Sequence, residues 1–150
     1  MESIANNDIR RFVEAQESST SGYCVALTEI LFGEKESHWM WYIFPQLRCL
    51  GHSWRADYYG IADRAEAQRY LDHPLLGSRL REITTMLLMH DDRNIVDIVG
   101  YVDALKVRSC MTLFDQLSPN DLFDEALRRF FGGERCEVTL AALQDEVSQG

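Results

Sequence analysis

The sequence predicts an all-α protein: a single compact domain over residues 1–150, with about seven to eight helices in an orthogonal arrangement. Apolar residues recur at intervals of three and four along most of the chain, which is the spacing of one helix face. No stretch keeps the period-two alternation of a half-buried strand. The prolines, which occur only at 45, 74 and 119, each fall where a helix would begin or end.

The first half of the chain contains most of the short predicted elements. They cover residues 8–16, 23–33, 37–51, 53–61 and 62–71. Asn7 and Ser53 are candidate caps for the helices that follow them, and Gly33 is a stop signal. Pro45 cannot lie inside a helix without the loss of a hydrogen bond, so residues 37–51 predict a short helix or 3₁₀ turn that breaks there.

The second half contains the longer predicted helices. They cover residues 74–90, 104–117, 120–131 and about 137–147, whereas residues 95–100 predict only a helical turn or a short helix. Asp103 is a candidate cap for one of them, and Ser118 followed by Pro119 is a helix-start signal for another. Gly77 falls in a first helical turn, where glycine costs roughly 1 kcal/mol relative to alanine. Close approach of another backbone segment is therefore expected at Gly77.

Composition excludes several classes of function. The formal net charge of −9 argues against general nucleic-acid binding, which needs a basic face. No run approaches the ~20 apolar residues of a membrane span. The opening residues, MESIANNDIRRFVEAQ, lack the apolar region of a signal peptide. The four cysteines are widely spaced and form no C-x-x-C pair, so we expect mostly buried, reduced thiols in a cytoplasmic protein.

No motif predicts a cofactor or a metal. The sequence contains no P-loop, no G-x-G-x-x-G, no H-E-x-x-H and no G-x-S-x-G. Cys49 and His52 have C-x-x-H spacing, but a zinc site would need further ligands that nothing in the sequence indicates. We therefore expect neither a cofactor nor a metal.

The stretch SHWMWYIFPQLRCLG, residues 37–51, is the most unusual part of the sequence. It is crowded with aromatic side chains, and residues 37–56 contain no acidic residue, although the whole chain has 24. Arg48 and Arg55 make this segment locally cationic. Because its aromatic residues would point to all sides of a helix, most of the segment must be covered by other elements.

The polar groups in this segment leave two interpretations open. Burial of His38 or Gln46 without a partner would cost roughly 1–3 kcal/mol, and the indole N–H groups of Trp39 and Trp41 also need acceptors. These groups either find partners within a core element or line a pocket. Ser53 is a candidate for the same pocket, although its hydroxyl could instead serve only as a helix cap.

Two other segments supply candidate partners for such a pocket. His73 precedes a helix start with Arg79 close behind, an arrangement that suits an anion; the alternative is a solvated pre-proline histidine and a surface charge. Asp103 and Lys106 share one helix face, and Ser109 lies beside them. The alternative for that face is a solvated ion pair worth only about 0.2–0.5 kcal/mol.

Several motifs resemble the family called domain of unknown function 1810, and together they cover nearly the whole chain. They are RFVEAQ (11–16), SHWMWYIFPQL (37–47), LGHS (50–53), EAQRYLDHPLLGSRL (66–80), DALKVRSCMTLF (103–114) and FFGGERCEVTLAAL (130–143). The resemblance implies an all-α fold and brings no established activity. Cys49, Cys110 and Glu137 depart from the pattern of the family, which weakens any role for Cys110 or for a serine pair with Ser109.

These observations lead to two functional hypotheses. In the first, one pocket binds a small anionic ligand such as a nucleotide or an ADP-ribose-like molecule. Its predicted residues are His38 and His73 as catalytic groups and Trp39, Trp41, Gln46, Ser53, Arg79, Asp103, Lys106 and Ser109 as ligand-binding groups. A histidine would then support hydrolysis or group transfer as general acid/base. In the second, the chain is a helical protein-interaction module without catalytic activity.

Overall fold

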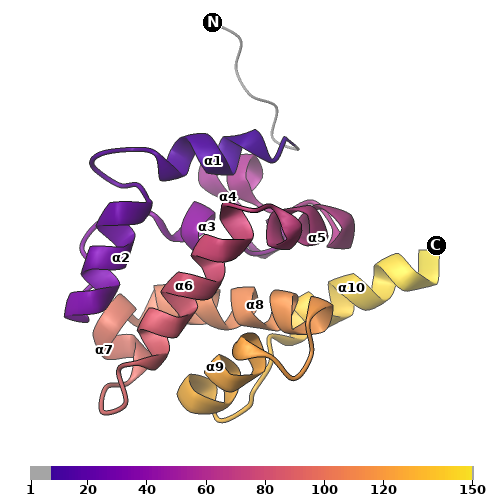
Figure 1. Ribbon diagram of the computed structural model, residues 1–150. Coiled ribbons are helices and arrows are strands. Elements are labelled where there is room, and N and C mark those ends of the chain that lie inside the picture. The colour runs from indigo at the N-terminus through magenta and orange to yellow at the C-terminus, as the bar shows by residue number, and fades with distance from the viewer. Residues whose placement is uncertain (1–7, 150) are drawn as a thin grey trace, which may run out of the picture.

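The computed structural model describes residues 8–149 and confirms the all-α prediction (Figure 1). In chain order the α-helices are α1 (Arg10–Gln16), α2 (Tyr23–Phe32), α3 (Met40–Ile43), α4 (Trp54–Tyr59), α5 (Arg64–Asp72), α6 (Leu76–Leu88), α7 (Ile95–Val99), α8 (Tyr101–Leu117), α9 (Leu122–Phe131) and α10 (Glu137–Gln149). A 3₁₀ helix covers Arg48–Leu50. No β-strand occurs within residues 8–149.

The ten α-helices within the described residues exceed the seven to eight that were predicted. Much of the excess comes from short elements, because α3, α4 and α7 contain 4, 6 and 5 residues. A helix of only one or two turns contains too few apolar residues for their spacing to distinguish it from an irregular turn.

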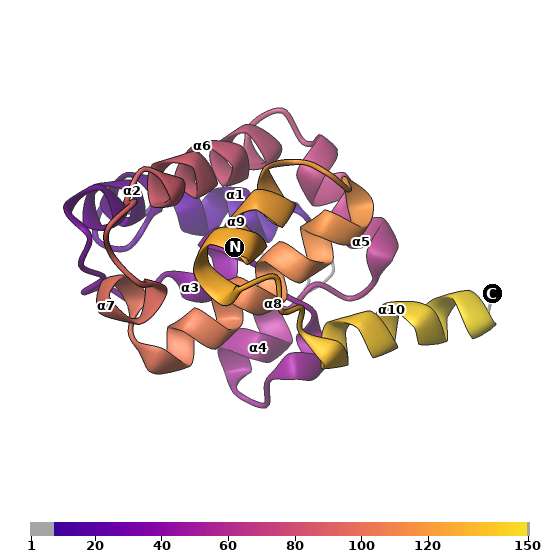
Figure 2. The same cartoon turned by 90° about the horizontal axis from the view of Figure 1, so that it is seen from below.

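Helix α8 is the longest, with 17 residues, and it packs against α5, α7, α9 and α10. Figure 1 shows α6 crossing the molecule between α2 and α5, and it contacts both. In both views α10 extends away from the other helices towards the C-terminus (Figures 1 and 2). The buried apolar side chains of these helices form one cluster, in which Phe12, Trp39, Tyr70 and Phe114 are each 0% exposed.

Two glycines have the structural roles that the sequence predicted. Gly33 ends α2 with φ 78°, a left-handed conformation that favours glycine. At Gly77 an added Cβ would collide with the backbone carbonyl oxygen of Leu71. Glycine is therefore required there by close contact between α6 and the end of α5.

Two predicted helix caps are wrong. Helix α8 starts at Tyr101 after Gly100, so Asp103 lies inside its first turn and is not its cap. Ser118 follows the end of α8, and Asp121 caps α9 by accepting a 2.7 Å hydrogen bond from the backbone N–H of Leu122. Asn120, which lies between Ser118 and Asp121, has a left-handed backbone conformation with φ 58°. The predicted cap Asn7 lies outside the described residues, whereas Ser53 does cap α4.

The four cysteines are free thiols, and Cys24 and Cys49 are exposed while Cys110 and Cys136 are buried. Only half of them are therefore in the interior, fewer than expected. Within residues 8–149, no helix is both long enough and apolar enough to span a bilayer.

Candidate functional site

The aromatic segment at residues 37–51 is mainly a core element. Trp39 and Phe44 are 0% exposed, and Trp41 is 7% exposed at the edge of the core. Helix α3 ends at Ile43, before Pro45, as the sequence predicted. The chain beyond it is held by an isolated parallel bridge between Leu47 and Ile61.

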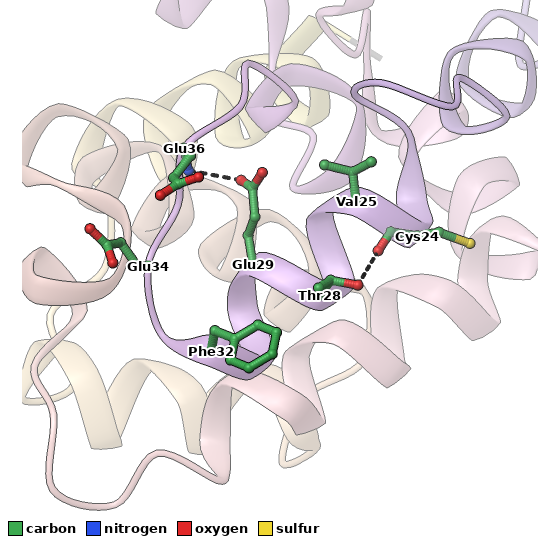
Figure 3. Close-up of a pocket in the computed structure, with 7 residues that line it drawn as sticks. All are labelled: Cys24, Val25, Thr28, Glu29, Phe32, Glu34 and Glu36. Atoms are coloured by element: carbon green, nitrogen blue, oxygen red, sulfur yellow. Dashed lines mark hydrogen bonds between the residues drawn. The ribbon is translucent and has the colours of Figure 1, made fainter.

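Glu29 of α2 positions the chain that leads into this segment. Its carboxylate accepts hydrogen bonds from the backbone N–H groups of Glu36 (2.8 Å) and Ser37 (2.9 Å). It also accepts from Ser37 Oγ (2.6 Å) and from Trp39 Nε1 (2.9 Å). Figure 3 shows the Glu29 side chain directed at the backbone of Glu36. Burial alone would raise the pKa of Glu29, but these hydrogen bonds outweigh it and lower that pKa to about 2.

A cavity of about 200 Å³ lies where this loop meets α3, α4 and α8. Its walls come from four separate segments of the chain. They are Lys35 and His38 of the loop, Met40, Trp41 and Tyr42 of α3, Ser53 and Arg55 at the start of α4, and Asp103 and Lys106 of α8.

The cavity combines cationic groups with an aromatic ring. Asp103 lies between two lysines: its Oδ2 is 2.9 Å from Lys35 Nζ, and its Oδ1 is 3.1 Å from Lys106 Nζ. The Lys106 ammonium also lies 6.0 Å from the ring centroid of Trp41. Arg55 adds a third cation to the lining, and its guanidinium lies 4.9 Å from the ring centroid of Trp54.

The charges in this cavity do not cancel. The lining contains three cationic side chains, those of Lys35, Arg55 and Lys106, and one carboxylate, that of Asp103, so it carries a net positive charge in a chain of net charge −9. His38 is the one imidazole on the lining, and its side chain is exposed. This arrangement can attract an anion and can place a proton donor or acceptor beside it.

Five of the predicted site residues meet at this cavity: His38, Trp41, Ser53, Asp103 and Lys106. Ser53 has both of the roles that the sequence left open. Its Oγ accepts a 3.2 Å hydrogen bond from the backbone N–H of Ala56 as the cap of α4, and the same residue lines the cavity.

The structure does not bring the two aromatic-segment residues Trp39 and Gln46 to the lining of this cavity. Trp39 has no exposed surface, and its indole N–H is satisfied by Glu29. Its ring therefore cannot stack against a ligand. Gln46 is 3% exposed and belongs to the bridge with Ile61, whose N–H donates to the Gln46 carbonyl at 2.9 Å.

The structure also places His73, Arg79 and Ser109 away from the lining of this cavity. The Nδ1 atom of His73 accepts hydrogen bonds from the backbone N–H groups of Leu75 and Leu76, at 3.1 and 3.2 Å. The ring of His73 thus acts as a cap before α6.

Arg79 and Ser109 also bind other parts of the protein. The Arg79 guanidinium donates to Gln16 Oε1 at 3.2 Å and lies 4.9 Å from the Tyr23 ring centroid. The Ser109 hydroxyl donates to the carbonyl of Leu105 at 3.1 Å, one turn earlier in the same helix.

Lys35, Arg55 and Glu29 were not predicted as site residues from the sequence. Lys35 and Lys106 are the only lysines of the chain, and this rarity was a signal that both could serve one site. Arg55 lies within the segment that lacks acidic residues. Glu29 interrupts the apolar face of α2 just before Ile30, which marks it as a partly buried carboxylate in need of donors.

A larger hollow, of about 550 Å³, lies between α2 and the same loop (Figure 3). Its lining includes Phe32 and the three carboxylates of Glu29, Glu34 and Glu36. Carboxylates repel anions, so this acidic hollow is unsuitable for the ligand that the sequence suggested. No group of three or more His, Cys, Asp or Glu side chains within residues 8–149 is arranged to hold a metal ion.

The comparisons with known proteins agree with the fold. The chain is similar to a solved structure described as the conserved hypothetical protein Rv1873 from Mycobacterium tuberculosis, with 43% sequence identity and a TM-score of 0.87. The alignment covers 91% of this chain and 96% of that one. No curated protein matches. The family described as "Protein of unknown function (DUF1810)" matches residues 6–143. The chain therefore belongs to the DUF1810 family.

Proposed function

We propose that the cavity around Trp41 binds a small anionic molecule that carries an aromatic ring, such as a nucleotide or an ADP-ribose-like compound. The observation that supports this proposal is that Lys35 and Lys106 both contact Asp103 in a cavity whose lining also includes Arg55. Like charges at one place raise the energy of the unliganded protein, and an anion would relieve that repulsion. In an acidic chain, such a cluster selects for a local ligand and not for a long polyanion.

The role of Asp103 is to hold the two lysines in place. It neutralises one positive charge and orients both ammonium groups towards the same space. The site therefore keeps its geometry before a ligand arrives, which lowers the entropy cost of binding. Ser53 and Tyr42 add hydroxyl groups to the lining for neutral polar atoms of the ligand.

His38 is the group that would move a proton if binding leads to hydrolysis or group transfer. It is the one imidazole on the lining, and imidazole can donate or accept a proton near neutral pH. We expect His38→Ala to abolish turnover of a substrate while leaving its affinity within about threefold of wild type, since general acid/base catalysis contributes ~10²–10⁴-fold. Equal turnover by wild type and H38A would remove this catalytic role.

Calorimetric titration tests the binding proposal. The ligands are ADP, ADP-ribose and inorganic pyrophosphate, and the proteins are wild type, K35Q, K106Q and R128Q. Each lysine variant still leaves Asp103 with one lysine partner. R128Q is the matched control, because it removes a positive charge from a surface ion pair on α9, away from the cavity lining.

Loss of one charged hydrogen bond predicts affinity reduced roughly 10- to 100-fold in K35Q and K106Q, with R128Q unchanged. The absence of binding by wild type to any of the three ligands would overturn the proposal. So would an equal effect of R128Q and K106Q.

The alternative, a protein-interaction module, is favoured by one observation. Phe32 is 75% exposed beside the carboxylates of the acidic hollow, and exposed aromatic residues are common anchors of interfaces. Cross-linking of the purified chain to a synthetic basic peptide would test it. F32A should reduce cross-linking if the hollow is the interface, whereas K106Q should leave it unchanged.

A further inference from the structure

A second hollow, of about 480 Å³, adjoins the cationic cavity. The two share His38, Tyr42 and Arg55 on their linings. The second hollow is the more open of the two, and two aromatic residues of α4, Trp54 and Tyr59, form part of its surface. The two hollows are therefore neighbours, close enough for the two ends of one ligand to reach both across His38 and Arg55.

Trp54 differs from the other two tryptophans in its exposure. It is 64% exposed, whereas Trp39 is 0% exposed and Trp41 is 7% exposed. Trp54 is the first residue of α4, and the cap formed by Ser53 fixes the backbone at that point. The indole therefore stands at the rim of the hollow on a constrained backbone, with its ring largely in water.

The surroundings of Trp54 suit a flat, electron-poor ring. The Arg55 guanidinium lies 4.9 Å from the Trp54 ring centroid, and the Tyr59 ring lies 6.5 Å from it at an interplanar angle of 47°. Arg55 thus belongs to the Trp54 surface and also lines the cationic cavity. Thr20 and Ser21 contribute hydroxyl groups to the lining, and Glu36 contributes a carboxylate that can accept hydrogen bonds from amino groups at the edge of such a ring.

We infer that Trp54 is the ring-stacking residue of the site. A heteroaromatic base would lie on the Trp54 indole in the second hollow, and its phosphate would pass Arg55 into the cavity between Lys35 and Lys106. The ligand class is then a nucleoside phosphate or a similar ring joined to an anion through a short polar linker. This inference rests on the proposed function and specifies which part of the molecule binds the ring.

This assignment separates the ligand into two parts that can be tested independently. Inorganic pyrophosphate carries only the anion, whereas ADP carries the anion and the base. Stacking on an aromatic side chain tolerates any base, because every base has a π face. A Trp54 variant should therefore affect ADP and leave pyrophosphate unaffected, while a lysine variant should affect both.

Calorimetric titration of ADP and of pyrophosphate into wild type, W54A, W54F, K106Q and F32A tests the inference. We expect W54A to weaken ADP binding roughly 10- to 100-fold and to leave pyrophosphate binding within about twofold. W54F should restore most of the ADP affinity, because it keeps an aromatic face. F32A is the matched control, since Phe32 is another highly exposed aromatic residue and lines neither the cationic cavity nor the hollow at Trp54.

Three outcomes would overturn the inference. If W54A leaves ADP affinity unchanged while K106Q weakens both ligands, Trp54 does not bind the ring and the proposed function survives. If W54A weakens ADP and pyrophosphate equally, the effect is not on a base. If wild type binds neither ligand, the proposed function fails together with the inference.

Discussion

The indole Nε1 of Trp39 donates a 2.9 Å hydrogen bond to Oε1 of Glu29, so a fully buried tryptophan is tied to a carboxylate on the preceding helix. The same carboxylate holds the backbone of the loop between them. Because that loop carries Lys35 and His38 into the cavity, Glu29 links the core of the protein to the candidate site.

Glu29→Ala should destabilise the protein by about 1–3 kcal/mol, because it leaves the Trp39 N–H buried without an acceptor. Urea unfolding followed by far-ultraviolet circular dichroism measures the change. Glu34→Ala is the control, as Glu34 is exposed on the same loop, and its free energy of unfolding should stay within about 0.5 kcal/mol of wild type. An E29A protein as stable as the control would show that the loop is not held by this carboxylate.

Stability should fall at acid pH, in part through Glu29. The folded-state pKa of Glu29 is about 2, whereas its ordinary value is 4.5, so the folded protein binds this proton less readily than the unfolded chain. The stabilisation is present above pH 4.5 and is lost as the pH falls towards 2. Unfolding curves across this range should show a smaller acid-dependent loss in E29Q than in wild type.

Asp121 should account for another part of the acid dependence. Hydrogen bonds from Ser118 and the Leu122 backbone, together with Arg81, lower its pKa to about 2 against the opposing effect of burial. D121N combined with E29Q should therefore reduce the acid-dependent loss of stability further than E29Q alone. Parallel curves for wild type and the double variant would contradict both assignments.

The ion pair between Arg11 and Glu66 should be costly to break from one side only. Their closest atoms are 2.8 Å apart, and their side chains are 0% and 1% exposed. Removal of a single partner from such a pair costs about 3–5 kcal/mol, because the other charge stays buried without compensation. E66A should lower the midpoint of thermal unfolding strongly.

A double variant and a surface variant distinguish this explanation from a general loss of packing. The destabilisation of R11M/E66L should be smaller than the sum of the effects of R11M and E66L, since no uncompensated charge remains in the double variant. The sum is the right reference because R11M also removes the donor to the backbone carbonyls of Asp8, Tyr58 and Gly60. Arg69→Ala should cost less than about 1 kcal/mol, because the Arg69 side chain is 56% exposed and lies 4.0 Å from Glu66. Additive effects of R11M and E66L would show that buried charge is not the cause.

Thiol reactivity should divide the four cysteines into two pairs. Cys24 and Cys49 are exposed, whereas Cys110 and Cys136 are buried. Burial also raises the pKa of the Cys110 thiol well above its usual value, which suppresses the reactive thiolate. A chromogenic disulfide reagent should modify two thiols rapidly in the native protein and all four in denaturant. Rapid modification of the C24S/C49S variant would show that Cys110 or Cys136 is accessible in the native protein, which contradicts this division.

The helices could be predicted from local information wherever they are long enough to show a period. The three-and-four spacing located α6 and α8, and the stop at Gly33 and the break before Pro45 were correct. The predicted start of α9 was wrong, because Ser118 and Asp121 are equally plausible caps until the left-handed conformation of Asn120 is known. Choices between nearby caps depend on backbone geometry that local composition does not specify.

Residue spacing and composition were enough to predict the all-α class, the burial of the aromatic segment and five of the residues that line the cavity. That Lys35 and Arg55 line it as well, and that His73 and Arg79 do not, depends on how distant helices pack together. The local sequence fixes the chemistry of a side chain, whereas its partners come from segments far away along the chain. Glu29 accepts a hydrogen bond from Trp39, Gln16 accepts one from Arg79, and Asp103 forms ion pairs with both lysines.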